Sequence, residues 1–117
     1  KTHHQILIVG GGNAGISIAA QLLRKDSSLD IVIIDGAKKH YYQPAWTLVG
    51  GGEFNIQDTE RDEASVIPNR ATWVQQMVSG FKPDISMSTQ IRCSFAGADC
   101  ETEGPLVLVC SLISFFI

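Results

Sequence analysis

The sequence predicts an α/β fold with a doubly wound parallel sheet, and three observations carry that prediction. Two apolar runs, Ile6–Val9 and Ile31–Ile34, are typical of parallel strands that are covered on both faces. The apolar residues of the segment between them have helical spacing. A strand, helix and strand of this length form a right-handed parallel crossover, so this part of the chain should make a βαβ unit.

The helix should begin near Asn13 and end at the basic pair Arg24-Lys25. Positive charge in the last turn complements the helix dipole. Its apolar residues recur at offsets of three and four residues and form one face that can pack on the sheet: Ile16, Ala19, Ala20, Leu22 and Leu23.

The turn between the first strand and the helix, Gly10 to Gly15, reads GGGNAG and fits the GxGxxG pattern of dinucleotide-binding sites. Gly10 would allow a sharp turn, Gly12 would let a pyrophosphate approach the backbone, and Gly15 would let the helix pack closely on the strand. The helix amides and the positive end of the helix dipole would then bind an anion without a basic side chain. The turn contains no lysine, which excludes a P-loop.

Asp35 ends the second apolar run, about 20 residues past the glycine turn, where the pattern places an acid that accepts hydrogen bonds from a ribose. Its charge would repel a 2′-phosphate, which disfavours NADP. The alternative is that the glycines only pack a generic βαβ unit and that Asp35 is a turn residue. The order of strand, turn, helix, strand and acid favours dinucleotide binding.

Composition narrows the class of protein. A chain of 117 residues makes one domain at most and is short for a complete nucleotide-dependent enzyme, so we expect a piece of a longer protein. A net charge of -3 and a pI near 5.5 provide no basic surface, so no nucleic-acid partner is expected. Cys93, Cys100 and Cys110 lack metal-binding spacing, and no apolar run reaches the roughly 20 residues of a membrane helix.

The segment Tyr41–Gly52 is an unusual loop with two tyrosines, a tryptophan and three consecutive glycines. Loops at the carboxyl ends of parallel strands are where ligands sit in such folds. A short helix from Pro44 that packs Trp46 and Leu48 into the core is compatible with a ligand-binding role, and both interpretations stay open.

Further along, Ala71–Val78 is predicted to be a third strand that ends near Gly80, with Trp73 in the core. Residues 85–95 alternate between apolar and polar, as in a half-buried strand. Turns are expected at Lys82–Asp84, Gly97, Asp99 and Gly104-Pro105, and another strand at Leu106–Val109.

The segment from Ile6 to about Asp84 resembles the N-terminal part of the sulfide:quinone oxidoreductase family, flavoproteins of the disulfide-reductase-like superfamily. The specific matches are HYYQPAWTLVGGG at residues 40–52, ASVIP at residues 64–68 and ATWVQQMV at residues 71–78. The glycine motif fits many flavoproteins, whereas the first of these segments is close to diagnostic for this group.

The resemblance implies FAD binding and oxidation of sulfide, with electrons passed through the flavin to a membrane quinone. Asp35 would hold the adenosine ribose, Gln43 would lie near the cofactor, and the backbone of Val78 would meet the adenine ring. The diphosphate would be held by Gly10, Gly12, Asn13, Ala14 and Gly15. The complete enzyme would be a peripheral membrane protein of a mitochondrial inner membrane or a bacterial plasma membrane.

The chain departs from the family pattern after Asp84. The family's redox cysteines lie further along, so none of the three cysteines here is identified with them, and no catalytic or metal-binding residue is predicted. Residues 1–84 are predicted to be the N-terminal part of a Rossmann-like FAD-binding domain, and residues 85–117 a divergent or truncated, strand-rich continuation. The alternatives are an FAD-binding fragment of a flavocytochrome c sulfide dehydrogenase or a type II NADH dehydrogenase, or a non-catalytic nucleotide-binding remnant.

Overall fold

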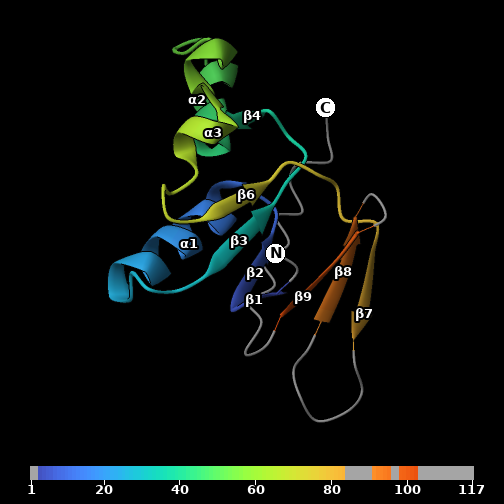
Figure 1. Ribbon diagram of the computed structural model, residues 1–117. Coiled ribbons are helices and arrows are strands. Elements are labelled where there is room, and N and C mark those ends of the chain that lie inside the picture. Colours follow the sequence, from blue (N-terminus) through green and yellow to red (C-terminus); the bar gives the residue numbers. More distant parts are fainter. Residues whose placement is uncertain (1–2, 84–90, 96–97, 103–117) are drawn as a thin grey trace.

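The centre of the fold is a three-stranded parallel sheet (Figure 1). The structure is a computed structural model that describes residues 3–83, 91–95 and 98–102. The sheet has the order β2-β3-β6 and consists of β2 (Ile6–Val9), β3 (Ile31–Ile34) and β6 (Thr72–Val74). The parallel pairing of β2 with β3, which are joined through helix α1 (Asn13–Lys25), confirms the predicted α/β class and its βαβ unit.

Helix α1 covers one face of the sheet because small and apolar residues recur along one side of it. Gly15, Ala19 and Leu23 are buried at a spacing of four residues. Ala19 and Leu23 pack in one cluster with the residues of β2 and β3 on the helix-covered face of the sheet: Ile6, Ile8, Ile31 and Ile33. The helix ends at Asp26, whose N–H donates to the Leu22 carbonyl over 2.9 Å.

The opposite face of the sheet carries a second cluster. Leu7, Val32 and Ile34 are buried there, and Val74 and Val78 pack against them. Because successive strand residues point to opposite faces, two covered faces require strands that are apolar at every position. This requirement explains the uninterrupted runs ILIV and IVII.

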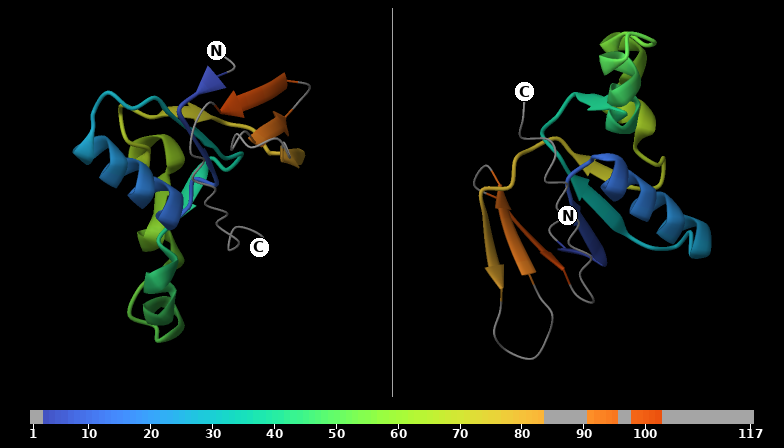
Figure 2. Two further views of the ribbon diagram at one scale, coloured as in Figure 1. Left: turned by 90° about the horizontal axis from the view of Figure 1, so that it is seen from below. Right: turned by 180° about the vertical axis from the view of Figure 1, so that it is seen from behind.

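A second sheet with the order β1-β9-β8-β7 lies beside the first. It consists of β1 (His3–His4), β7 (Gly80–Pro83), β8 (Ile91–Phe95) and β9 (Ala98–Thr102). The β1–β9 pair is parallel, whereas β7–β8 and β8–β9 are antiparallel. Figures 1 and 2 show α1 on one side of the parallel sheet and strands β7 to β9 on the other.

The chain makes a long excursion between β3 and β6. Strands β4 (Lys39–Tyr41) and β5 (Glu60–Asp62) form an antiparallel ribbon. Between them lie η1 (Gln43–Ala45), α2 (Trp46–Gly50) and η2 (Ile56–Thr59), and α3 (Glu63–Val66) follows β5. Figures 1 and 2 show this excursion, drawn in green, projecting away from the carboxyl end of β3.

The third strand was predicted too long. β6 ends at Val74, since the N–H of Gln76 donates to the Val74 carbonyl over 2.9 Å and turns the chain out of the sheet. Gly80 begins β7 instead of ending a strand. Lys82 and Pro83 pair with β8 instead of forming a turn, and a proline is tolerated there because β7 is an edge strand among the described residues.

Other predictions beyond residue 80 have mixed outcomes. Asp99 lies within β9 and is not a turn residue. Residues 91–95 form β8, which agrees with the end of the predicted alternating strand. Residues 85–90, Gly97, Gly104-Pro105 and Leu106–Val109 lie outside the described residues. The pairing of β7 with β8 crosses the domain boundary predicted after residue 84, and that boundary stays a prediction.

The two tryptophans and Leu48 differ in their surroundings. Trp73 packs against the α1-covered cluster, as predicted for a core residue. A short helix after Pro44 is present, but Leu48 is 44% exposed, so the prediction that it packs into the core is wrong. Trp46 is half-buried, and its indole N–H donates to Thr59 Oγ1 over 3.1 Å. The excursion therefore folds on itself and leaves part of its apolar surface open.

Burial in β3 predicts a large effect of truncation. Ile33→Ala removes a side chain with no exposed surface, so it should destabilise the protein by about 2–5 kcal/mol. Ile56→Ala is the matched control, since Ile56 is 39% exposed and the same truncation there should cost less than about 1 kcal/mol. Urea unfolding of both variants measures the difference. Equal losses would contradict the assignment of β3 to the core.

Candidate nucleotide-binding site

The glycine turn leaves β2 through a backbone conformation that favours glycine. Gly10 has a φ of 101°. Its N–H donates to the carbonyl of Ile34 over 2.9 Å, which continues the β2–β3 pairing into the turn. A side chain at this position would be strained, because L residues rarely adopt positive φ. The geometry agrees with the sharp turn expected of Gly10.

Gly15 brings the first turn of α1 against the glycine turn. A Cβ atom at Gly15 would overlap the carbonyl oxygen of Gly10 and would lie 3.2 Å from Cγ2 of Ile8. Gly15 is buried, so this contact cannot be relieved by moving a side chain into solvent. The close helix-to-strand packing expected of Gly15 is therefore present.

The N-terminus of α1 is open toward solvent. Gly12 is the N-cap residue, and no side chain caps the helix by a hydrogen bond. Asn13 and Ala14 are exposed. The first N–H groups of a helix have no partner within the helix. Here they lie at the positive end of the dipole of a 13-residue helix. This arrangement is suited to an anion such as a diphosphate.

Asp35 is held at the glycine turn by four hydrogen bonds. Its carboxylate accepts the N–H of Gly11 at Oδ2 and the N–H of Ala37 at Oδ1, the latter over 2.7 Å. Its backbone N–H donates to the Val74 carbonyl, and its carbonyl accepts the indole N–H of Trp73, each over 3.1 Å. The predicted ribose-binding acid therefore contacts the turn directly and is fixed by the neighbouring strand β6.

A second acid at this place was missed by sequence reasoning. Glu63, the first residue of α3, is 1% exposed, and its Oε1 has no hydrogen-bond partner within the described part of the chain. Its Oε2 lies 3.5 Å from Nδ1 of His40. A Cβ atom at Gly11 would overlap Glu63 Oε1 and lie 3.1 Å from Cβ of Asp35. Gly11, the second glycine of the turn, thus leaves room for two acids.

Burial, together with the smaller effect of the neighbouring charge of Asp35, raises the pKa of Glu63 to about 7. Little in the sequence marks Glu63, since it stands in a polar, acidic segment with other exposed acids. One signal was available: a glycine without a role in the GxGxxG pattern, Gly11, indicates that another group lies close to the backbone there.

The remaining predicted site residues lie on other segments. Gln43 begins η1 in the excursion and is half-buried. Val78 lies beyond β6, and its side chain packs against the cluster of Leu7, Val32 and Ile34. The structure thus brings together the glycine turn, α1 and Asp35, while the predicted roles of Gln43 and Val78 toward a cofactor stay predictions.

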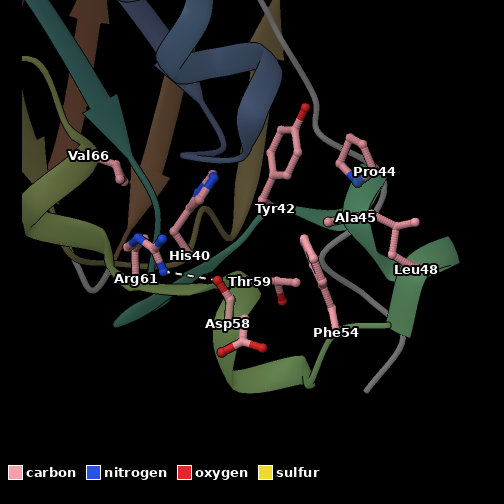
Figure 3. A pocket seen from close by; sticks show the side chains of 10 residues that line it. All are labelled: His40, Tyr42, Pro44, Ala45, Leu48, Phe54, Asp58, Thr59, Arg61 and Val66. Atoms are coloured by element: carbon pink, nitrogen blue, oxygen red, sulfur yellow. Dashed lines mark hydrogen bonds between the residues drawn. The ribbon is translucent and has the colours of Figure 1, made fainter. Parts of the chain in front are cut away.

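A hollow of about 580 Å³ lies in the excursion (Figure 3). Its lining combines apolar side chains with a buried histidine and an arginine: His40, Tyr42, Pro44, Ala45, Leu48, Phe54, Asp58, Thr59, Arg61 and Val66. His40 links it to the glycine turn, because the same imidazole faces Glu63. The loop that was predicted to bear a ligand therefore contains a hollow. The buried pair of His40 and Glu63 connects this hollow to the glycine turn.

The described residues contain no cluster of histidine, cysteine, aspartate and glutamate that could hold a metal ion. Among the same residues, no helix is both long and apolar enough to cross a bilayer.

Comparison with known proteins finds several sequence relatives of the same name, among them the following two. The chain is 54% identical over 85 residues to the mitochondrial sulfide:quinone oxidoreductase of Dictyostelium discoideum and 37% identical over 84 residues to that of Mus musculus. Each match covers 72% of this chain and 19% of the relative, so the chain spans about a fifth of the length of the curated relatives it matches. No family model matches the chain.

Solved structures share the fold over nearly the whole chain. The sulfide:quinone oxidoreductase of Aquifex aeolicus matches 92% of this chain and 24% of its own, with a TM-score of 0.70 at 21% identity. The NDH2 of Plasmodium falciparum, solved in complex with NADH, matches 94% of this chain and 24% of its own, with a TM-score of 0.57 at 13% identity. At these identities the likeness concerns the fold alone.

The parallel sheet, the glycine turn, the following helix and the acid after β3 place the chain in the class of Rossmann-type folds. The two solved structures described above share this fold. Within this class, the chain is a homologue of the sulfide:quinone oxidoreductases, as the resemblance of its loop segments predicted.

The packing at Gly15 predicts the effect of adding one methyl group. Gly15→Ala should destabilise the protein by about 2 kcal/mol or more, because the new Cβ overlaps backbone that cannot move aside. Gly50→Ala is the matched control, since a Cβ there meets nothing within 4 Å. Thermal unfolding of both variants measures the difference, and a loss at Gly50 as large as that at Gly15 would contradict the packing argument.

The raised pKa of Glu63 predicts a pH dependence of stability. A carboxyl whose pKa rises on folding from 4.5 to about 7 stabilises the fold fully below pH 4.5, and this contribution is lost as the pH rises to about 7. The free energy of unfolding of the wild type, relative to Glu63→Gln, should therefore fall by up to about 3 kcal/mol between pH 4.5 and 7.5. Urea unfolding across this range measures it. Glu53→Gln, an exposed change of the same type, should show no such trend.

Proposed function

We propose that this chain forms the ADP-binding half of an FAD site in an enzyme that oxidises sulfide and passes the electrons through the flavin to quinone. One observation carries the proposal: the glycine turn, bonded to Asp35, lies in a chain that is 54% identical over 85 residues to a protein named as a sulfide:quinone oxidoreductase. The turn, the helix and the acid fit the cofactor's ADP half.

The fit rests on the shape and the donors of the turn. At Gly11 a side chain would collide with Glu63, and at Gly15 with the carbonyl of Gly10, so these glycines let the turn pack tightly between the two acids and the first turn of α1. The N–H groups of Asn13, Ala14 and Gly15 would donate to the diphosphate at the start of α1, while Gly10 and Gly12 shape the approach. No positively charged side chain is needed, because the helix terminus supplies the partial charge.

Asp35 would accept hydrogen bonds from the ribose hydroxyls. Each of its carboxylate oxygens already accepts one backbone N–H, and each has a further lone pair available. The main chain at Val78 would meet the adenine ring, since its side chain is committed to the sheet. Gln43 would lie near the cofactor from the excursion.

When bound, FAD supplies the two-electron redox chemistry, and the residues of this chain bind and orient its ADP half. Sulfide and a membrane quinone would be the substrates of the complete enzyme, which we expect to associate peripherally with a membrane. The redox cysteines of that reaction are expected outside this chain, which spans about a fifth of its curated relatives.

The electron donor separates this function from its alternatives. The protein translated from the full reading frame should purify with oxidised flavin, lose the flavin's visible absorption when sulfide is added without oxygen, and regain it when quinone is added. Bleaching by NADH and not by sulfide would favour a type II NADH dehydrogenase. Transfer to a haem partner would favour a flavocytochrome c sulfide dehydrogenase. Failure to bind FAD or ADP in equilibrium dialysis would favour a non-catalytic remnant.

The ribose-binding role of Asp35 can be tested by a charge change. Asp35→Asn keeps one acceptor oxygen but loses the charge, so FAD and ADP should bind about tenfold more weakly or worse. Asp62→Asn is the control, since the side chain of Asp62 is 72% exposed and faces Lys39. Isothermal titration with ADP measures both variants, and unchanged affinity in Asp35→Asn would refute the role.

A further inference from the structure

Glu63 stands out among the polar residues of the described chain because it is buried without being fully hydrogen-bonded. It is 1% exposed, and Oε1 has no hydrogen-bond partner within the described residues. A buried polar atom without a partner is costly, and such atoms in native proteins call for a functional explanation. Its backbone is firmly placed, since its N–H donates to the Lys38 carbonyl over 3.0 Å.

The unpartnered oxygen points at the glycine turn. Gly11 lacks the Cβ atom that would overlap Glu63 Oε1, and the same missing atom would lie 3.3 Å from Oδ2 of Asp35. Both carboxyl groups therefore approach the turn where its backbone is bare. The N-terminus of α1 begins one residue later, at the N-cap residue Gly12.

The charges at the glycine turn determine whether Asp35 and Glu63 can both be ionised when a diphosphate binds there. A helix N-terminus offers roughly half a positive charge, whereas a cofactor diphosphate brings two negative charges. Asp35 is needed as a carboxylate, because it accepts two backbone N–H groups. An ionised Glu63 would add a further negative charge in a water-poor site, whereas a protonated Glu63 adds none.

The titratable and charged groups on the elements around Glu63 fall into two sets. Asp35 after β3 and His40 on β4 lie beside Glu63, and the glycine turn itself carries no such group. Along the β4–β5 ribbon, Lys39, Tyr41, Glu60 and Asp62 alternate with His40 and Arg61 and bond to one another on the other face. The guanidinium of Arg61 donates to the carbonyls of Asp58 and Glu60. Within the described structure, the imidazole of His40 lies beside the carboxyl of Glu63, with 3.5 Å between Nδ1 and Oε2.

We propose that Glu63 is a further residue of the nucleotide half-site and takes up a proton when a diphosphate-bearing cofactor occupies the glycine turn. This inference rests on the proposed function, because it requires the diphosphate to bind at α1. Binding of the anion disfavours the charged form of the buried acid, so proton uptake and binding support each other. Glu63 acts here through charge and position, not through the redox chemistry.

Isothermal titration of ADP-ribose into the protein at pH 6.0 to 8.5, in buffers that differ in ionisation enthalpy, measures the proton count directly. ADP-ribose is used because its diphosphate is esterified at both ends and does not titrate in this range. The uptake by the wild type should rise from about half a proton per ADP-ribose at pH 7 toward one proton above pH 8, because a carboxyl with a pKa of about 7 is already half protonated at pH 7. Its affinity should fall with rising pH, by at most about tenfold per pH unit. Glu63→Gln should take up no proton and bind ADP-ribose with nearly constant affinity, while Glu53→Gln should behave as the wild type.

His40→Asn identifies the group that takes up the proton. Retained uptake in this variant supports Glu63, whereas loss of uptake only in His40→Asn overturns the inference in favour of the imidazole. Binding of ADP-ribose by the wild type without proton uptake at pH 8 overturns it too, whether or not Glu63→Gln folds. Absence of ADP and FAD binding at every pH overturns the proposed function itself, which separates the two failures.

Discussion

The hydrogen bonds of Asp35 join the glycine turn to the parallel sheet, and the geometry of the proposed nucleotide site depends on them. One residue accepts the N–H of Gly11, bonds to Val74 on β6 through its backbone N–H, and accepts the indole N–H of Trp73 at its carbonyl. Turn, β3 and β6 are thereby held in one frame. Because the anion-binding N–H groups of α1 follow the turn directly, their direction is set by the same contacts.

The glycines serve this frame in different ways. Gly10 supplies a backbone conformation, Gly15 allows the helix to touch the turn, and Gly11 leaves space for the buried carboxyl of Glu63. Burial disfavours the negative charge of Glu63, and the nearby charge of Asp35 adds to this effect. The site therefore combines Asp35, whose carboxylate accepts backbone N–H groups, with Glu63, whose pKa of about 7 lies near physiological pH.

The excursion between β3 and β6 connects this site to the hollow around Tyr42 and Phe54. The imidazole of His40 contacts Glu63 on one side and lines the hollow on the other. The diagnostic segment HYYQPAWTLVGGG begins at this histidine, so the part of the chain that carries the family resemblance is also the part that adjoins the nucleotide turn. Fold neighbours with different electron donors share the sheet, which is why the function rests on the sequence relatives and not on the fold.

The sequence by itself determined the βαβ unit, the glycine turn and the position of Asp35, because these depend on local spacing: apolar runs, helical periodicity and residues that permit positive φ. It did not determine the length of β6, the pairing of Lys82 and Pro83 in β7, or the exposure of Leu48. Only the tertiary structure placed Glu63 beside Gly11 and Asp35. These features depend on contacts between distant segments, and an acid in a polar stretch looks the same in sequence whether it faces water or a bare glycine.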